Sequence, residues 1–417
     1  MTLGCGLALF ALPMVKAQDF PQWRGANRDA IIEMPGVNLN WEARQPRLLW
    51  TFRAAGAGYS TPTIVGNVLY CQGADTEDFA FALNAVTGEL IWRQALGELF
   101  VMDRGNGPRG SITVDGNRLY LMRGGGQLHC LSAKDGQLIW QKDMRKDFGG
   151  DIMSQWNWGY CESPIVDGDR VICTPGGEGG VMIALDKRTG DLLWRTTEWP
   201  DVSGYCSPIV VEIEGVRQYI QQVKKGVIGV EAETGKVLWS GAFGTGMGPA
   251  IPTPVYDAEQ RIVYVTAEYG AGCAAFQVSK QGEQFEAKPL YANRSMSNYH
   301  GGVILKAGNV YGCSRAPGWV CQDLATGEVR WKERVKEPGS GAILCVNDRM
   351  LVLDERTGSI TVAGLSPEGW QEFGRMAIPE RSEVESMDHM VWTHLAVAHG
   401  KLYQRDHDLL FCYELKD

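Results

Sequence analysis

Residues 82–92 read ALNAVTGELIW, and close variants return as CLSAKDGQLIW at 130–140, ALDKRTGDLLW at 184–194, GVEAETGKVLW at 229–239 and CQDLATGEVRW at 321–331. Each copy predicts a strand, a tight turn and a second strand, with glycine at the turn position where a positive φ costs little. Four residues after each glycine comes a tryptophan, a large ring suited to packing one sheet on its neighbour. Weaker copies lie at 276–291, ending in Tyr291, and at 353–375.

A second kind of hairpin alternates with the first. It consists of an apolar strand, a Gly or Asp turn and another apolar strand, as in GSITVDGNRLYLMRGG at 110–125. Eight copies run from Gly66 to Gly400, about 48 residues apart. Two hairpins per repeat make one four-stranded antiparallel blade. The sequence therefore predicts an all-β fold, a single eight-bladed β-propeller.

The two ends of the repeated region complement each other. The last repeat stops at LLFCYELKD (409–417) without its turn and tryptophan, while the N-terminal segment supplies PRLLW, ending at Trp50. We expect an N-terminal strand near residues 47–52 to complete the eighth blade and close the ring. A linear β-solenoid would have shorter repeats and no such exchanged strand.

Residues 1–17 differ from the rest of the chain. An apolar run of nine from Leu7 to Val15 is followed by Lys16 and Ala17, which predicts a secretory signal peptide before a propeller domain at 18–417. The run is too short to cross about 30 Å of hydrocarbon, and no later segment is apolar enough to do so. We expect a monomer without a transmembrane segment, located in the periplasm or secreted from a bacterial cell.

Composition narrows the range of partners. Of 417 residues, 40 are Lys or Arg and 49 are Asp or Glu, which gives a net charge of −9. A nucleic-acid surface needs a basic excess, so none is expected. Eleven cysteines in an exported chain allow disulfides. Most lie within apolar strand-like runs, which favours buried thiols.

The iterated A-x-D-x-x-T-G-x-x-x-W phrase resembles the PQQ-repeat β-propellers, where PQQ is pyrroloquinoline quinone. That superfamily includes the quinoprotein alcohol dehydrogenases and the outer-membrane assembly lipoprotein BamB. The resemblance covers roughly residues 20–417. Within the superfamily, the chain most resembles the exported PQQ-binding-like propellers of planctomycetes, which begin with a phrase like FPQWRGANRDA (20–30). It implies the propeller fold and leaves two functions open, since the superfamily contains both enzymes and scaffolds.

The inner strand of each blade begins at the central axis, so the residues just before the eight inner strands should converge on one funnel. Polar positions that differ between blades are where a repeated scaffold acquires function. Glu162, His300 and His394 are the candidate catalytic residues, because a carboxylate and two imidazoles can relay a proton. The candidates for binding a ligand offer a cation or an aromatic face: Arg109, Trp156, Trp158, Tyr160, Tyr205, Lys225, Tyr299 and Arg315.

Each of these candidates also has a purely structural interpretation. A tyrosine before an inner strand can simply fill the channel, Glu162 can pair with Arg109, and His300 can bond to a neighbouring blade. Asn157, Glu162 and Asn298 could supply calcium oxygens, although their spacing does not demand it.

Two functions remain. One is a ligand- or protein-binding scaffold whose funnel face takes a small molecule, a glycan or an envelope protein. The other is an enzyme similar to the quinoprotein alcohol dehydrogenases, which would oxidise an alcohol or sugar with PQQ and Ca²⁺ as the resemblance implies. The sequence has no adjacent cysteine pair to cap the quinone and no haem motif to accept electrons, which favours the scaffold.

Overall fold

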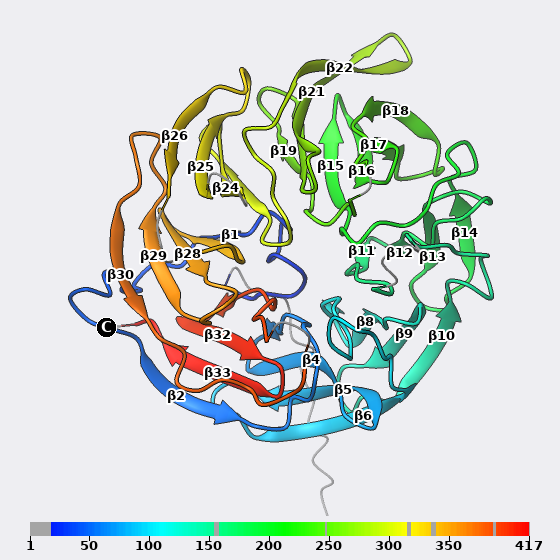
Figure 1. The fold of residues 1–417 in the computed structure, drawn as a ribbon. Helices are drawn as coiled ribbons and strands as arrows, with labels where there is room; N and C mark the ends of the chain where they lie inside the picture. The colour runs from blue at the N-terminus through cyan, green and yellow to red at the C-terminus, as the bar shows by residue number, and fades with distance from the viewer. Residues whose placement is uncertain are drawn as a thin grey trace, which may run out of the picture.

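The computed structural model describes residues 18–153, 158–246, 248–314, 318–334, 339–386 and 389–416. They form eight sheets arranged around one axis, as Figure 1 shows. The predicted eight-bladed propeller is confirmed. The expected signal peptide at 1–17 lies outside the described residues, and none of the described ones forms a helix that could span a membrane.

Each blade is built on four antiparallel strands, ordered from the axis outward, and the innermost of the four is the shortest in every blade. Blades 1 to 4 are built from β3 (Thr63–Val65), β4 (Val68–Ala74), β5 (Glu77–Asn84) and β6 (Leu90–Glu98); β7 (Thr113–Asp115), β8 (Arg118–Met122), β9 (Gln127–Ser132) and β10 (Leu138–Asp143); β11 (Ile165–Asp167), β12 (Arg170–Cys173), β13 (Ile183–Asp186) and β14 (Leu192–Arg195); and β15 (Ile209–Ile213), β16 (Val216–Gln222), β17 (Gly226–Glu231) and β18 (Val237–Ala242).

Blades 5 to 8 follow the same plan. Their strands are β19 (Val255–Asp257), β20 (Ile262–Ala267), β21 (Gly272–Gln281) and β22 (Gln284–Asn293); β23 (Val303–Lys306), β24 (Asn309–Ser314), β25 (Gly318–Asp323) and β26 (Val329–Glu333); β27 (Ile343–Val346), β28 (Arg349–Leu353), β29 (Ile360–Gly364) and β30 (Glu372–Met376); and β31 (Ala396–Ala398), β32 (Lys401–Asp406), β33 (Leu409–Glu414) and the N-terminal β2 (Arg47–Phe52).

A β-bulge recurs in the outer strand of every blade. In blade 1, Leu90 pairs with Leu83 and Trp92 with Ala82, so Ile91 is an extra residue between them. The same shift precedes the aromatic residue in seven of the outer strands, and blade 7 has a shift in the corresponding place. Because a bulge re-aims the side chains that follow it, it turns the tryptophan toward the next blade.

The tryptophan of one blade stacks on the turn glycine of the next. Trp194 of blade 3 covers Gly235 of blade 4, where a Cβ would lie 2.4 Å from the ring, and its Nε1 donates to the carbonyl oxygen of Ala232 at 3.1 Å. Gly235 has a φ of +76°, so glycine is needed both for the turn and for the close approach. Equivalent contacts join Trp50 to Gly88, Trp92 to Gly136, Trp140 to Gly190 and Tyr291 to Gly327.

The hydrophobic core lies between blades. One buried cluster joins Tyr70 and Ala80 of blade 1 to Leu119 and Leu131 of blade 2, and similar clusters lie at the other interfaces. All ten cysteines of the described region are free thiols, nine of them buried. The buried-thiol interpretation therefore holds for these residues.

The ring closes as predicted at the eighth blade. β2 pairs with β33, from Arg47 opposite Glu414 to Phe52 opposite Leu410. Arg405 of β32 is a second link between blade 8 and blade 1. Its fully buried guanidinium donates to the carbonyl oxygens of Ala55, Ser60 and Gln72, which belong to blade 1 or its entry loop.

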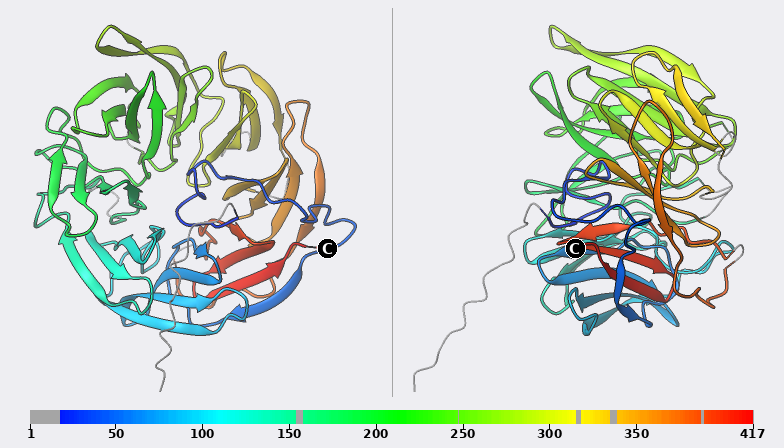
Figure 2. Two further views of the ribbon diagram at one scale, coloured as in Figure 1. Left: turned by 180° about the vertical axis from the view of Figure 1, so that it is seen from behind. Right: turned by 90° about the vertical axis from the view of Figure 1, so that its left-hand side faces the viewer.

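The segment before β2 fills the central channel, which the sequence did not predict. Figure 2 shows it in dark blue, crossing the middle of the ring on the face opposite that of Figure 1. Residues 31–32 form β1 (Ile31–Ile32), which pairs in parallel with β27 and gives blade 7 a fifth strand. We call residues 19–32 the axial plug.

The axial plug is hydrogen-bonded to every blade. Its contacts, from blade 1 to blade 8, are Phe20 with Ile64, Pro21 with Val114, Arg28 with Ser163 and with Pro208, Trp23 with Thr253, Arg24 with Val303, Ala30 with Cys345 and Asp19 with His399.

Replacing Trp194 with alanine should cost about 3–5 kcal/mol of unfolding free energy, because it empties a packed blade interface and removes an indole hydrogen bond. Leu193→Ala, one residue earlier and 49% exposed, is the matched control and should stay within about 0.5 kcal/mol. Urea unfolding of both variants measures the difference. Equal stability of the two would refute the docking role of the indole.

Candidate functional site

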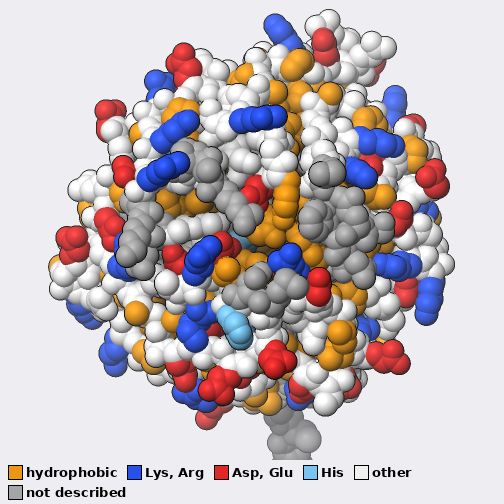
Figure 3. Space-filling model, in the orientation of Figure 1, with side chains coloured by type: hydrophobic (Ala, Val, Ile, Leu, Met, Phe, Trp, Pro, Cys, Tyr) orange, Lys and Arg blue, Asp and Glu red, His pale blue; other side chains and the backbone are white. Residues whose placement is uncertain are grey.

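A cavity of about 120 Å³ opens at the axis on the face where the inner strands begin. Figure 3 shows this face, with hydrophobic side chains at the bottom of a central hollow and Lys, Arg, Asp and Glu around it. Apart from Trp23, every lining residue lies in a loop that leads into an inner strand, and the loops of blades 1–6 and 8 all contribute. This is the funnel that the repeat predicted.

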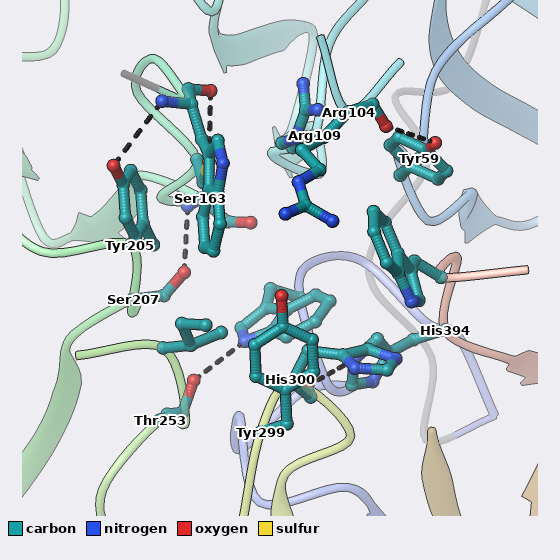
Figure 4. A pocket seen from close by; sticks show the side chains of 15 residues that line it. Tyr59, Arg104, Arg109, Ser163, Tyr205, Ser207, Thr253, Tyr299, His300 and His394 are labelled. Carbon is teal, nitrogen blue, oxygen red and sulfur yellow. Dashed lines mark hydrogen bonds between the residues drawn. The ribbon is translucent and has the colours of Figure 1, made fainter. Parts of the chain in front are cut away.

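Two aromatic groups face each other across the cavity. On one side, the rings of Trp158 and Tyr205 lie 5.1 Å apart, and Tyr205 is held by a hydrogen bond from the Trp158 backbone N–H to its hydroxyl. On the other side, Tyr59 lies 5.4 Å from Trp392, which in turn contacts Tyr299 at 6.5 Å. Figure 4 shows Tyr205 and Tyr59 at opposite sides of the cavity. The walls suit a flat ring.

Arginine supplies the positive charge. Arg104 and Arg109 line the cavity between the two aromatic groups (Figure 4). Arg109 donates to the carbonyl oxygens of Gly105 and Gly107 at 2.9 and 3.1 Å, and its guanidinium lies 5.2 Å from the Tyr59 ring centroid. Among the described residues, no carboxylate lies within ion-pairing distance of Arg109.

Two more arginines lie in the axial plug. Arg24 and Arg28 are fully buried, and Arg28 is bonded to backbone carbonyls of blades 3 and 4. Burial lowers the pKa of Arg24 to about 10 and that of Arg28 to about 9, so both remain charged at neutral pH. The axis therefore favours an anion at the cavity.

The groups of the cavity that could move a proton are held neutral. Burial lowers the pKa of His300 to about 4 and that of His394 well below its usual range, and it raises the pKa of the Cys161 thiol to about 11. His394 lies 3.0 Å from the His300 carbonyl oxygen through Nε2, so this nitrogen donates. Within the described part of the chain, neither buried ring nitrogen of His300 has a hydrogen-bond partner, and Nδ1 lies 3.7 Å from a carboxylate oxygen of Glu355.

Glu162 lies behind the cavity wall, between Cys161 and Ser163, which line it. Its carboxyl is fully buried, and one oxygen accepts the Thr174 backbone N–H at 2.6 Å, while the other has no hydrogen-bond partner among the described residues. Burial raises its pKa to about 7, although the nearby Arg28 opposes this. The nearby cation is therefore Arg28 of the axial plug, and no ion pair joins Glu162 to Arg109.

The structure gathers only part of the predicted set around the cavity. The predicted residues that line it are Arg109, Trp158, Tyr205, Tyr299, His300 and His394. Tyr160 instead is buried between blades and donates to the Pro175 carbonyl oxygen. Lys225 lies in a separate groove over blades 3 and 4, bonded to Pro200. Trp156, Asn157 and Arg315 lie outside the described residues.

Nine of the lining residues were absent from the predicted set, among them Trp23, Arg104 and Trp392. Trp23 belongs to FPQWRGANRDA (20–30), a stretch that matches neither of the two repeated hairpins. The lack of a matching repeat was the sequence signal that could have singled out this stretch as functional. Trp392 lies two residues before His394, and like Tyr59 of blade 1 it lies four residues before the inner strand of its blade.

The described lining does not fit a calcium-bound quinone. Ca²⁺ takes six to eight oxygen ligands, mostly carboxylate and amide oxygens, yet none of the described lining residues carries a carboxylate or a carboxamide. Asn298 is buried, and its amide is fully used by Gly302 and the Cys313 carbonyl. Within the described ranges, no three His, Cys, Asp or Glu side chains cluster as a metal site.

Fold and repeat together define a PQQ-repeat β-propeller. The family model described as "Outer membrane protein assembly factor BamB" matches residues 28–95 and 78–333. This is more than half of the chain, and the chain belongs to that family.

Among curated proteins, the tetrathionate hydrolase of Acidithiobacillus ferrooxidans is 26% identical over 227 residues, which is 50% of this chain and 42% of the hydrolase. The BamB of Yersinia pestis is 23% identical over 279 residues, 64% of each chain. The matched region thus spans 42–64% of the length of these relatives.

Two solved structures share the fold. BamB from Moraxella catarrhalis has a TM-score of 0.63 at 16% identity, with 89% of this chain and 98% of that chain covered. A quinohemoprotein alcohol dehydrogenase from Comamonas testosteroni has a TM-score of 0.62 at 12% identity, covering 95% and 80%. At these identities the likeness concerns the fold alone.

Glu162 should contribute a fall in the free energy of unfolding as pH rises from about 4.5 to about 7, opposite in sign to the contribution of the buried His300 and His394. The unfolded chain releases the proton near the ordinary pKa of 4.5, whereas the folded chain keeps it until about 7, so folding becomes less favourable across that window and changes no further above it. The total is about 3 kcal/mol. Because glutamine does not titrate, Glu162→Gln should lose this pH-dependent contribution to the free energy of unfolding.

Urea unfolding at pH 5 and pH 8 measures the effect. Glu89→Gln, at an exposed position in a turn, is the control and should follow the wild-type pH dependence. If the free energy of unfolding of Glu162→Gln has the same pH dependence as that of the wild type, the prediction for Glu162 is wrong.

Proposed function

We propose that this propeller is a binding protein whose axial cavity takes a small organic anion with a flat ring, without a bound metal. The observation that carries the proposal is the pair of opposed aromatic groups with arginine between them and no carboxylate among the described lining residues. Rings stack on Trp and Tyr, while a carboxylate or sulfonate accepts from a guanidinium.

The protonation states favour binding over acid–base catalysis. With His300 and His394 neutral and the Cys161 thiol protonated near pH 7, the cavity holds neither a charged acid nor an efficient base or nucleophile. Glu162 lies in the wall rather than in the cavity. These groups shape the cavity and exclude water.

The proposal places this binding in the bacterial envelope. Its support is the signal-like pattern of residues 1–17 and the family description, which concerns outer-membrane protein assembly. An envelope protein that offers an anionic aromatic group could use the same cavity. Redox chemistry with PQQ and Ca²⁺ is the weaker alternative, because the described lining lacks the oxygen ligands of calcium.

Calorimetric titration of the full-length chain tests the proposal with three matched probes: 2-naphthoate, the neutral 2-naphthamide and the non-aromatic cyclohexanecarboxylate. We expect 2-naphthoate to bind at least tenfold more tightly than either of the others. Arg109→Gln should weaken 2-naphthoate about 10–100-fold, the value of a charge-assisted hydrogen bond, and leave 2-naphthamide unchanged. Arg188→Gln, at an exposed arginine of blade 3, is the matched control.

Equal binding of all three probes, or no binding of any, would refute the proposal. PQQ titrated with and without Ca²⁺ examines the alternative, since calcium-dependent binding would restore the quinoprotein hypothesis. Tetrathionate is included because one relative is named as its hydrolase. If it binds more tightly than 2-naphthoate, the flat ring is not what the cavity selects.

A further inference from the structure

The axial plug reaches the cavity from the opposite face of the ring. Asp19 accepts hydrogen bonds from the Gly66 N–H and from His399, both in hairpin turns at the far ends of inner strands. Met34 leaves the channel beside Asn347, in the equivalent turn of blade 7. Between these points the chain folds up into the channel, and Trp23 reaches the level of Thr253, just before β19.

Trp23 is held in place from two sides. Its Nε1 donates to the Thr253 hydroxyl at 3.0 Å, and its ring lies 4.5 Å from that of His394. It is the one described lining residue that comes from the axial plug. The indole therefore separates the cavity from the part of the channel that the plug fills.

The backbone of the axial plug is tightly coiled. Arg24, Gly25, Arg28 and Ala30 all have a positive φ between 60° and 84°, and three of these four are not glycine. Such a conformation is unfavourable for residues with a Cβ and persists only where the surroundings impose it. Here contacts with all eight blades impose it, so the position of Trp23 is fixed by the whole ring.

We infer that the axial plug sets the depth of the cavity and that Trp23 determines how long a ligand it accepts. This rests on the proposed function, the binding of an anion with a flat ring. A ligand anchored by its anionic group at Arg109 extends its ring between the aromatic walls until it meets the indole. Trp23 is thus a specificity-determining residue that the repeats do not contain.

Two probes of different length test this: 2-naphthoate and the longer 6-phenyl-2-naphthoate, titrated by calorimetry into the full-length chain. The wild type should prefer the shorter acid. Trp23→Ala should bind the longer acid at least tenfold more tightly than the wild type does, while the shorter acid weakens several-fold. Trp23→Phe should shift the preference in the same direction by less, and it serves if the alanine variant does not fold.

Trp194→Ala is the matched control, because it makes the same substitution at a blade interface away from the cavity. Destabilisation alone should leave its preference for the shorter acid unchanged, and it does not explain a gain of affinity. If the wild type binds 2-naphthoate but neither Trp23 variant changes the ratio of the two affinities, the inference is wrong and the proposed function stands. Failure of every chain to bind either acid overturns both.

Discussion

At five of the blade junctions, an aromatic residue of one outer strand stacks on the turn glycine of the next blade, and this is the contact on which the ring depends. A four-stranded sheet has two apolar faces and cannot bury both alone. The bulge before Trp92, Trp140 or Trp194 turns the indole toward the neighbour, and a glycine there leaves room for the ring. One pair of residues thus supplies both the turn and the interface, which explains why the pair is repeated.

Closing eight blades into a ring creates a channel lined by the ends of inner strands. Their backbone groups need partners, and the axial plug supplies many of them, with Arg24 and Arg28 donating to carbonyls of several blades. The plug also changes what the channel can do, because it closes one end. What remains is a cavity with a floor, aromatic walls and a positive charge, rather than a passage through the molecule.

The fold is shared with a quinohemoprotein alcohol dehydrogenase, but a shared fold does not fix the chemistry of the cavity. The fold brings loops of seven blades to one point, but the side chains there decide the chemistry. Rings and guanidinium groups without carboxylate among the described lining favour stacking and ion pairing over calcium ligation. Burial that keeps His300, His394 and Cys161 neutral fits a surface that holds a ligand unchanged.

The sequence alone determined the blade number, the strand order and the exchange of β2, because turn glycines and tryptophans at fixed spacing act locally and between neighbouring repeats. It also indicated that residues before the inner strands meet, which placed Arg109, Trp158, Tyr205, Tyr299, His300 and His394 around one cavity. Only the tertiary structure decided that Tyr160 and Lys225 lie elsewhere and that Glu162 faces into the wall, since a shift of one position in a loop reverses a side chain. Only the tertiary structure placed Trp23 at the axis. Its segment does not belong to a repeat, so no repeated pattern predicts its position, and its contacts reach across the whole ring.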